Sequence, residues 1–261
     1  DSDDFAEISL EGGAALEGDF IRSSTIPGTL IARYSTTVAG DYKLTVLVNG
    51  EGIRGNRFDV ITRPNVIKAF QCDAAGSGLS ADILVDDKVD FLIQARDVYG
   101  NIRTQGDDPV TVQVFKYISD AATPYLIPYE SNMNDEQNGK YSANYLVTQS
   151  GEFRVYVMVD DDHIRNSPFP VRFHAGLPDA SKTTASGEGV IGGLKGEDMS
   201  FIITSRDKYG NRRTEGGLAQ SFSITFLPSI VESESLLLDR RDGTYLKSYK
   251  PSEGGDLSIA V

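Results

Sequence analysis

Apolar and polar residues alternate along the chain in short stretches, and this pattern predicts strands rather than helices. An alternation with a period of two places one face of a strand against a core and the other towards solvent. Residues that favour turns, such as Asn138-Gly139, separate the stretches. In the middle of the chain the alternating positions are Val89, Phe91, Ile93 and Ala95; Val110, Val112 and Val114; Tyr141, Ala143 and Tyr145; and Phe153, Val155, Val157 and Val159. We therefore expect an all-β fold.

The order of these stretches recurs along the chain at an interval close to the length of one domain. Tyr99-Gly100-Asn101 reappears as Tyr209-Gly210-Asn211, and an Arg-Asp pair precedes each copy. A third, partial copy lies at the start, where Ala39-Gly40-Asp41-Tyr42 matches Ser150-Gly151-Glu152-Phe153. Repetition at a fixed interval indicates tandem units of one fold.

The repeat predicts three units. Residues 1–67 are the C-terminal part of a unit that begins near its third strand, residues 68–175 are a complete unit, and residues 176–261 are the N-terminal part of another. We expect the chain to be a segment of a longer array. About seven strands in one unit are typical of an antiparallel immunoglobulin-like β-sandwich. Because the sequence has no Trp and one Cys, aromatic and aliphatic packing must hold the two sheets together.

The acidic composition disfavours two classes of partner. The chain has 38 Asp and Glu against 25 Lys and Arg, a formal net charge of −13. A nucleic-acid binder needs a basic stripe, and a protein held on an anionic membrane needs clustered Lys and Arg. No apolar run approaches the roughly 20 residues that span a bilayer. We expect neither a nucleic-acid partner nor a membrane span.

Few residues are available for catalysis. Cys72 is the only cysteine, which excludes an intrachain disulfide and a multi-thiolate zinc site, and His163 and His174 are the only histidines. Cys72 is expected to be a small buried hydrophobe, since no histidine lies near it in sequence. We therefore expect no enzyme activity and no cofactor.

Two groups of oxygen-bearing side chains could be read either as metal or ligand sites or as structural features. Asp160-Asp161-Asp162 and Asp107-Asp108 offer carboxylates to calcium, but the first unit has Asn49-Gly50-Glu51 in place of the three aspartates. A solvated acidic hairpin tip is the favoured interpretation. The repeated Asp-x-Tyr-Gly-Asn turn is interpreted as a structural turn, because Gly and Asn suit its backbone geometry. We therefore expect no metal. Three equivalent tyrosines are expected in the cores of the units: Tyr34, Tyr145 and Tyr249.

Several motifs, taken in order, resemble filamin-type immunoglobulin repeats. They are an A-x-G-x-G-L opening, the D-x-Y-G-N turn, a G-x-Y strand, an S-G-E or A-G-D turn, and Asn166-Ser167-Pro168-Phe169 before the last strand. The first unit departs from the pattern, with Gly55-Asn56-Arg57-Phe58 where the family has Ser-Pro-Phe. The resemblance implies a non-catalytic rod and scaffold segment in a cytoplasmic, cytoskeletal assembly, either actin-crosslinking or ciliary. Two alternatives stay open: an adhesion ectodomain at the cell surface, and spacer repeats of a multidomain enzyme.

The resemblance also implies protein partners that dock as extended peptides. In such repeats a peptide adds to the groove between the third and fourth strands. Those strands are expected at residues 110–115 and about 125–127, where Thr111, Gln113 and Phe115 face outward. The corresponding edge of the last unit is expected at residues 222–226. A neighbouring repeat that covers this edge is the alternative. The residues expected to form the partner-binding edge are Thr111, Gln113, Phe115, Tyr125 and Ile127.

Overall fold

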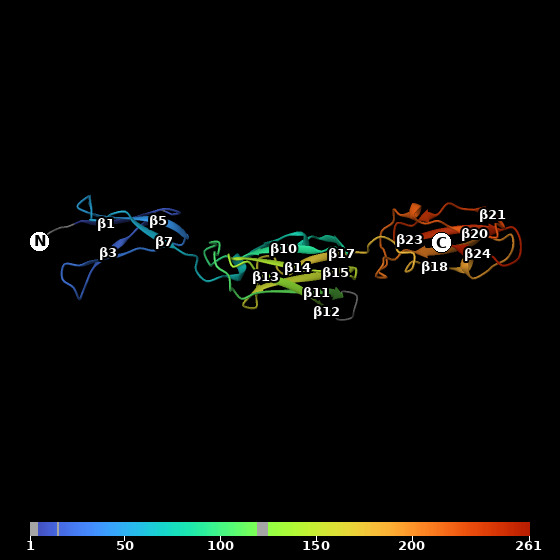
Figure 1. Ribbon diagram of the computed structural model, residues 1–261, viewed down its shortest axis with the longest axis horizontal. Helices are drawn as coiled ribbons and strands as arrows, with labels where there is room; N and C mark the ends of the chain where they lie inside the picture. Colours follow the sequence, from blue (N-terminus) through green and yellow to red (C-terminus); the bar gives the residue numbers. More distant parts are fainter. Residues whose placement is uncertain (1–4, 15, 119–124) are drawn as a thin grey trace.

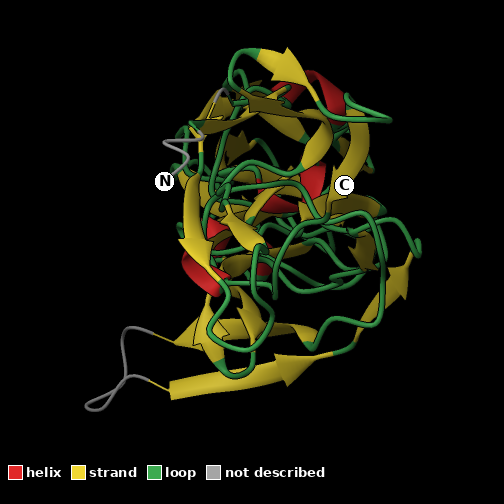
Figure 2. Ribbon diagram, turned by 90° about the vertical axis from the view of Figure 1, so that its left-hand side faces the viewer, coloured by secondary structure: helices red, strands yellow, loops and turns green. Residues whose placement is uncertain are grey.

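Three units of β-structure follow one another along the long axis of the molecule in a computed structural model (Figure 1). The structure describes residues 5–14, 16–118 and 125–261. Each sheet in this part of the chain draws its strands from a single unit. Helical structure among the described residues is limited to 3₁₀ turns (Figure 2), namely η1 (Ala69–Gln71), η2 (Ser77–Leu79), η3 (Glu188–Val190) and η4 (Ala219–Ser221). No described helix is long and apolar enough to cross a membrane.

The central unit is a sandwich of two sheets. One sheet has the order β13-β14-β10-β8, and the other has the order β12-β11-β15-β17-β9, with β16 beside β15. All pairs are antiparallel except β9 with β17. The strands are β8 (Asp73–Ala75), β9 (Asp82–Leu84), β10 (Val89–Gln94), β11 (Val110–Ile118), β12 (Tyr125–Tyr129), β13 (Ser131–Asp135), β14 (Lys140–Tyr145), β15 (Gly151–Val159), β16 (Asp162–His163) and β17 (Phe169–His174). The all-β immunoglobulin-like prediction is thus confirmed.

Alternating side chains from both sheets form the core of the central unit. In β10 the side chains of Val89, Phe91 and Ile93 are buried, while those between them are exposed. Phe153 and Phe173 of the opposite sheet meet edge to face, with ring centroids 5.2 Å apart. Cys72 is fully buried, as expected, and burial raises the pKa of its thiol. Aromatic and aliphatic packing occupies the place that a disulfide takes in antibody domains.

The first unit repeats the second half of the central unit. β1 pairs with β5 as β11 pairs with β15. Its β3–β4 hairpin has no counterpart of β10 and β8 beside it among the described residues. The strands are β1 (Ala6–Glu11), β2 (Leu16–Glu17), β3 (Asp19–Arg22), β4 (Leu30–Arg33), β5 (Gly40–Val48), β6 (Glu51–Gly52) and β7 (Phe58–Thr62).

The third unit repeats the first part of the central unit. β19 pairs with β18 and β23 as β10 pairs with β8 and β14, and β20 pairs with β24 as β11 pairs with β15. The expected edge at residues 222–226 only partly coincides with β20, which begins at Thr225. The strands are β18 (Thr184–Ser186), β19 (Met199–Thr204), β20 (Thr225–Leu227), β21 (Val231–Glu234), β22 (Leu238–Asp239), β23 (Thr244–Pro251) and β24 (Ser258–Ala260).

The three equivalent tyrosines differ in burial. Tyr145 and Tyr249 are buried, and their hydroxyls donate to the carbonyls of Gly78 and Gly189. Tyr34 is 41% exposed, because the strands that cover Tyr145 have no counterpart around it. The expected core position is therefore found in two units and not in the first.

Candidate functional site at the junctions between units

The repeated Asp-x-Tyr-Gly-Asn turn lies where one unit meets the next. Asp97 is 0% exposed at the start of the first copy. Its Oδ1 accepts hydrogen bonds from the backbone N–H groups of Tyr99 and Asn101, both at 2.9 Å. Burial alone would raise the pKa of Asp97, but hydrogen bonds from Asn101, Asn65 and Tyr99 outweigh it and lower the pKa. The buried group is therefore a carboxylate that organises the turn.

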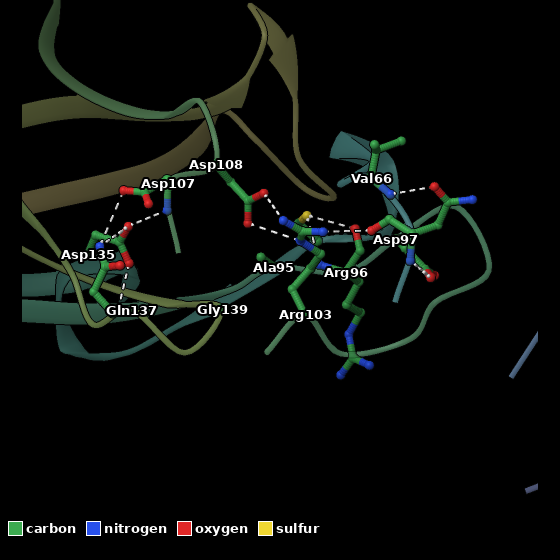
Figure 3. Close-up of polar contacts among 12 residues, drawn as sticks. Val66, Ala95, Arg96, Asp97, Arg103, Asp107, Asp108, Asp135, Gln137 and Gly139 are labelled. Atoms are coloured by element: carbon green, nitrogen blue, oxygen red, sulfur yellow. Dashed lines mark hydrogen bonds and ion pairs between the residues drawn. The ribbon is translucent and has the colours of Figure 1, made fainter. Parts of the chain in front are cut away.

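The same carboxylate holds the linker from the preceding unit. The backbone N–H of Asn65 donates to Asp97 Oδ2 at 2.8 Å, and Arg103 Nη1 donates to the carbonyl of Asn65 at 2.8 Å. Arg103 also forms a buried ion pair with Asp108, with an Nη2–Oδ1 distance of 2.6 Å (Figure 3). Both backbone polar groups of one linker residue, Asn65, are thus fixed to the central unit, and the linker cannot rotate freely at this residue.

Asn101 reaches across the junction. Its Nδ2 donates to the carbonyl of Thr37 at 2.8 Å, and its Oδ1 accepts from the backbone N–H of Ala39 at 2.9 Å. Both partners belong to the turn that connects β4 and β5 of the first unit. Asn101 Nδ2 also donates to Asp97 Oδ2 at 2.8 Å, which orients the amide. One side-chain amide therefore bridges two units through backbone groups alone. We name this arrangement the amide bridge.

A second amide bridge joins the central unit to the third. Asn211 Nδ2 donates to the carbonyl of Thr148 at 2.8 Å, and Asn211 Oδ1 accepts from the N–H of Ser150 at 3.0 Å. Asp207, 1% exposed, accepts from the backbone N–H groups of Asn211 and, in the linker, Gly176. The second amide bridge uses the same side-chain and backbone atoms as the first, and the aspartate binds the linker N–H in the same way.

The second junction has two further contacts. Asp86, in the loop between β9 and β10, accepts from the Lys208 ammonium and the Tyr209 hydroxyl of the third unit. These contacts, led by Lys208, lower the pKa of Asp86. His174 Nε2 lies 2.8 Å from Asp82, and its Nδ1 lies 3.2 Å from Glu215 of the third unit. We name the contact of Asp86 with Lys208 and Tyr209 the carboxylate latch.

The linker-binding arginine is paired differently at the two junctions. Arg213 Nη1 donates to the carbonyl of Gly176 at 2.5 Å, as Arg103 donates to the carbonyl of Asn65, and it also donates to the carbonyl of Ala175 at 3.1 Å. Leu218 stands where Asp108 pairs with Arg103, and the buried Nε of Arg213 has no hydrogen-bond partner among the described residues. The arginine at the first junction therefore has more of its hydrogen-bonding groups paired within its own unit than the arginine at the second.

A glycine keeps each arginine loop in place. Gly139 has a φ of +80°, and an added Cβ would lie 2.0 Å from the carbonyl oxygen of Arg103. Gly243 has a φ of +78°, and an added Cβ would lie 2.0 Å from the carbonyl oxygen of Arg213. Only glycine leaves room for this approach, which explains the recurrence of the G-x-Y motif.

The sequence predicted a structural turn here but did not reveal the contact between units. Within the turn, Asp97 accepts from the backbone N–H groups of Tyr99 and Asn101, and Arg96 donates to the carbonyl of Gly100. The recurrence of the Arg and the Asp is therefore already explained inside one unit, and it gave no signal of the junction. The partner groups Thr37, Ala39, Thr148 and Ser150 act through their backbone, so their side chains left no trace of this role.

The residues predicted to bind partners divide between two faces of one sheet. Thr111 and Gln113 are exposed on β11, and Phe115 lies on the same outward face, with its ring centroid 5.4 Å from that of Tyr156. Ile127 of β12 pairs with Lys116, so it lies on the opposite face from Phe115. Tyr125 begins β12, but its side chain lies outside the described residues.

β12 covers part of the edge that the sequence predicted to be a groove. It pairs with β11 from Val114 to Ile118, and the Ser131 hydroxyl donates to the carbonyl of Val112 at 3.2 Å. An added strand would therefore have to pair with the outer edge of β12 or with the first residues of β11. Pro128 lies in β12, where its missing N–H suits an edge strand. Pro124 lies outside the described residues.

The acidic residues considered for calcium are engaged separately. Asp108 accepts from Arg103, while the backbone N–H of Asp107 donates to Asp135 Oδ2 at 2.6 Å (Figure 3). Asp108 also accepts from the Tyr141 hydroxyl. No group of three or more metal-ligating side chains occurs within the described ranges.

Comparison with known proteins identifies the units. The model of the Filamin/ABP280 repeat matches residues 66–170 and 177–261. The chain belongs to the filamin repeat family. Filamin repeats are structural, non-catalytic modules that interact with other proteins. The family resemblance predicted from the motifs is confirmed.

The filamin repeats of this chain have relatives in large proteins. Filamin-C of Mus musculus is 25% identical over 232 residues, which cover 88% of this chain and 7% of Filamin-C. The flagellar outer-arm dynein alpha chain of Chlamydomonas reinhardtii is 29% identical over 171 residues, which cover 63% of this chain and 4% of the dynein chain. The chain thus spans less than a tenth of the length of either relative.

Solved structures share the fold at low sequence identity. The Escherichia coli adhesin FdeC has a TM-score of 0.53 at 16% identity, covering 85% of this chain and 68% of the adhesin. The bacterial integrin-binding protein invasin has a TM-score of 0.51 at 19% identity, covering 97% of this chain and 48% of invasin. These filamin repeats therefore share an arrangement of consecutive sandwiches with adhesins, and the likeness concerns the fold alone.

Proposed function

We propose that this segment is a spacer of fixed geometry in a cytoskeletal assembly, in which amide bridges hold consecutive filamin repeats in one orientation. The observation that carries the proposal is the recurrence of the same bridge, with Asn101 and Asn211 in the same role. Structural modules in tandem transmit position only if their junctions resist rotation. An untethered linker would leave relative motion between units as the default.

Each junction is held in two ways that support a rigid joint. The buried aspartate binds the linker and the turn of its own unit, and the asparagine binds the loop of the preceding unit. Each net hydrogen bond of this kind contributes about 0.5–1.5 kcal/mol. The two bonds of one bridge therefore favour one orientation by about 1–3 kcal/mol, which is enough to populate it strongly.

The relatives support a cytoskeletal setting. Filamin-C is one relative, and the dynein relative is by name a flagellar outer-arm protein, which supports an axonemal variant of the proposal. The adhesin-like fold supports the alternative, a surface protein that projects its sandwiches outward. Localisation of the tagged protein separates the two. Labelling of unpermeabilised cells would contradict the cytoskeletal setting, and association with filaments or axonemes would support it.

Small-angle X-ray scattering tests the spacer role directly. The chain should scatter as an extended particle with the three units in a row. The double variant Asn101→Ala, Asn211→Ala should show a smaller maximum dimension or a broader range of dimensions, with each unit still folded by circular dichroism. A wild-type profile that already requires freely rotating units would contradict the proposal.

Docking of partners by strand addition is a second element of the proposal. The outward face near Thr111, Gln113 and Phe115 is exposed beside an edge strand, and backbone groups of such an edge can pair with a peptide. Thr111→Asp with Gln113→Asp should abolish capture of a partner peptide without unfolding the unit. Unchanged capture would contradict docking at this edge. Asp161→Asn, at the exposed hairpin tip, is the matched control.

A further inference from the structure

The third unit contains a copy of the loop that receives an asparagine in the other two units. Residues 252–255 follow β23 as residues 148–151 follow β14 and residues 37–40 follow β4. The loop ends in a glycine of positive φ in each unit, at +153° for Gly40, +132° for Gly151 and +143° for Gly255. The position of the loop within the sandwich and its terminal glycine are therefore the same.

The surroundings of this loop are also reproduced. In the central unit the N–H of Asp86 donates to the carbonyl of Val147 at 2.9 Å, directly before the loop. In the third unit the N–H of Gly196 donates to the carbonyl of Pro251 at 2.9 Å. The loop before β19, which contains Gly196, is thus bonded beside residues 252–255 in the same way as the loop before β10, which contains Asp86, is bonded beside residues 148–151.

The two backbone groups used by the bridge are unoccupied in the third unit. By position, the carbonyl of Ser252 corresponds to that of Thr148, and the N–H of Gly254 corresponds to that of Ser150. Neither group has a hydrogen-bond partner among the described residues. Gly254 is exposed, whereas Ser150 is half-buried beneath the third unit. Because the bridge uses only backbone groups, the change from Ser to Gly leaves its chemistry intact.

We propose that residues 252–255 are a docking loop for the Asp-x-Tyr-Gly-Asn turn of a further filamin repeat. The asparagine amide of that repeat would donate to the carbonyl of Ser252 and accept from the N–H of Gly254. The two occupied bridges in the same chain define this partner. The inference rests on the proposed function, because it extends the same joint to a third position.

The central unit also contacts the turn of the next unit through Asp86, and the third unit has no such carboxylate. Gly196 stands in the place of Asp86, so the carboxylate latch has no counterpart there. A lysine before the tyrosine of the incoming turn would find no carboxylate in this place. The docking loop therefore fits a turn of the Val98-Tyr99 kind as well as one of the Lys208-Tyr209 kind.

An extended chain tests the inference. In this chain, residues 47–175 are added after Val261. The splice is made there because Val261 is equivalent to Val46 and Val157 in the repeat. The third unit thereby gains its last strands, and a complete repeat with a copy of Asn101 follows it. Amide hydrogen exchange at Gly254 should be about two- to tenfold slower than in the original chain, as one hydrogen bond predicts. Asn101→Ala in the added copy should remove this protection.

The outcomes separate the inference from the proposed function. Protection at Ser150 in the same sample reports the bridge that is already present. Fast exchange at Gly254 with protection at Ser150 would overturn the docking loop alone, while fast exchange at both would overturn the proposed joint. An extension by residues 158–261, which supplies a copy of Asn211, provides a second version if the first does not fold. Slow exchange across β23 establishes in each case that the third unit is folded.

Discussion

The side-chain amide of Asn101 donates to the carbonyl of Thr37 at 2.8 Å, across the boundary between the first unit and the filamin repeat that follows it. The equivalent bond from Asn211 to Thr148 has the same length. A residue that belongs to a turn in its own unit therefore also binds the backbone of the preceding one. Stability within a repeat and geometry between repeats share one side chain, and they can be separated by substitutions that affect only one of the two.

At the first junction, both the turn of the central unit and the orientation of the Asn101 amide depend on Asp97. Asp97→Asn should lower the free energy of unfolding of the central unit by about 1.5–3 kcal/mol at neutral pH, because the new amide group faces hydrogen-bond donors. Chemical denaturation followed by central-unit probes measures this change. Asp161→Asn removes the same charge at an exposed position and should leave the value within about 0.5 kcal/mol.

The same aspartate predicts a dependence on pH. Its folded pKa is lowered, so its carboxylate stabilises the unit above the unfolded pKa of about 3.9. This contribution is lost as the pH falls through the folded pKa. The difference between the wild type and Asp97→Asn should be full at pH 7 and should shrink below about pH 4. A difference that stayed constant down to pH 2 would contradict the assignment.

The buried tyrosines provide a test within the repeat. Tyr145→Phe removes the hydrogen bond to the carbonyl of Gly78 and should destabilise the central unit by about 1 kcal/mol. Tyr34→Phe, at the equivalent exposed position, should change the stability of its own unit by less than about 0.5 kcal/mol. Equal losses at the two positions, measured by denaturant titration, would contradict the different environments described above.

The carboxylate latch should make the second junction sensitive to salt. Asp86→Asn removes the charge that pairs with Lys208 and should loosen this junction at low ionic strength. The effect should fade as salt is added, because the pair is exposed. The first junction has Val98 in the place of Lys208 and serves as the matched control, with no salt dependence from this source. Distances between spin labels across each junction measure both responses.

Cys72 should report the opening of the central unit. It is fully buried and burial raises its pKa, so its thiol is protected both sterically and chemically. Reaction with a thiol reagent should follow the unfolding of this unit and should accelerate in Asp97→Asn. Rapid labelling of the folded wild type would contradict the burial of Cys72.

The sequence predicts the repeats and the strands well, because both leave a periodic pattern. The alternation in β10 and β15 reflects a core on one face, and the equivalence of Tyr145 and Tyr249 follows from spacing alone. The amide bridge was not predictable in this way, since its partners across the junction are a backbone carbonyl and a backbone N–H, from residues whose side chains are free to vary. The face on which Ile127 lies could not be predicted either, because the register between β11 and β12 depends on pairing rather than on composition.

Pulsed electron paramagnetic resonance tests the central claim most directly. Spin labels at Glu51 and Glu136 span the first junction, and labels at Glu136 and Leu236 span the second, with Cys72 replaced by Ala. All three labelled positions are exposed. We predict narrow distance distributions in the wild type, with Asn101→Ala broadening only the first and Asn211→Ala broadening only the second. Distributions that are equally narrow in both variants would contradict the claim that the amide bridges set the geometry of the array.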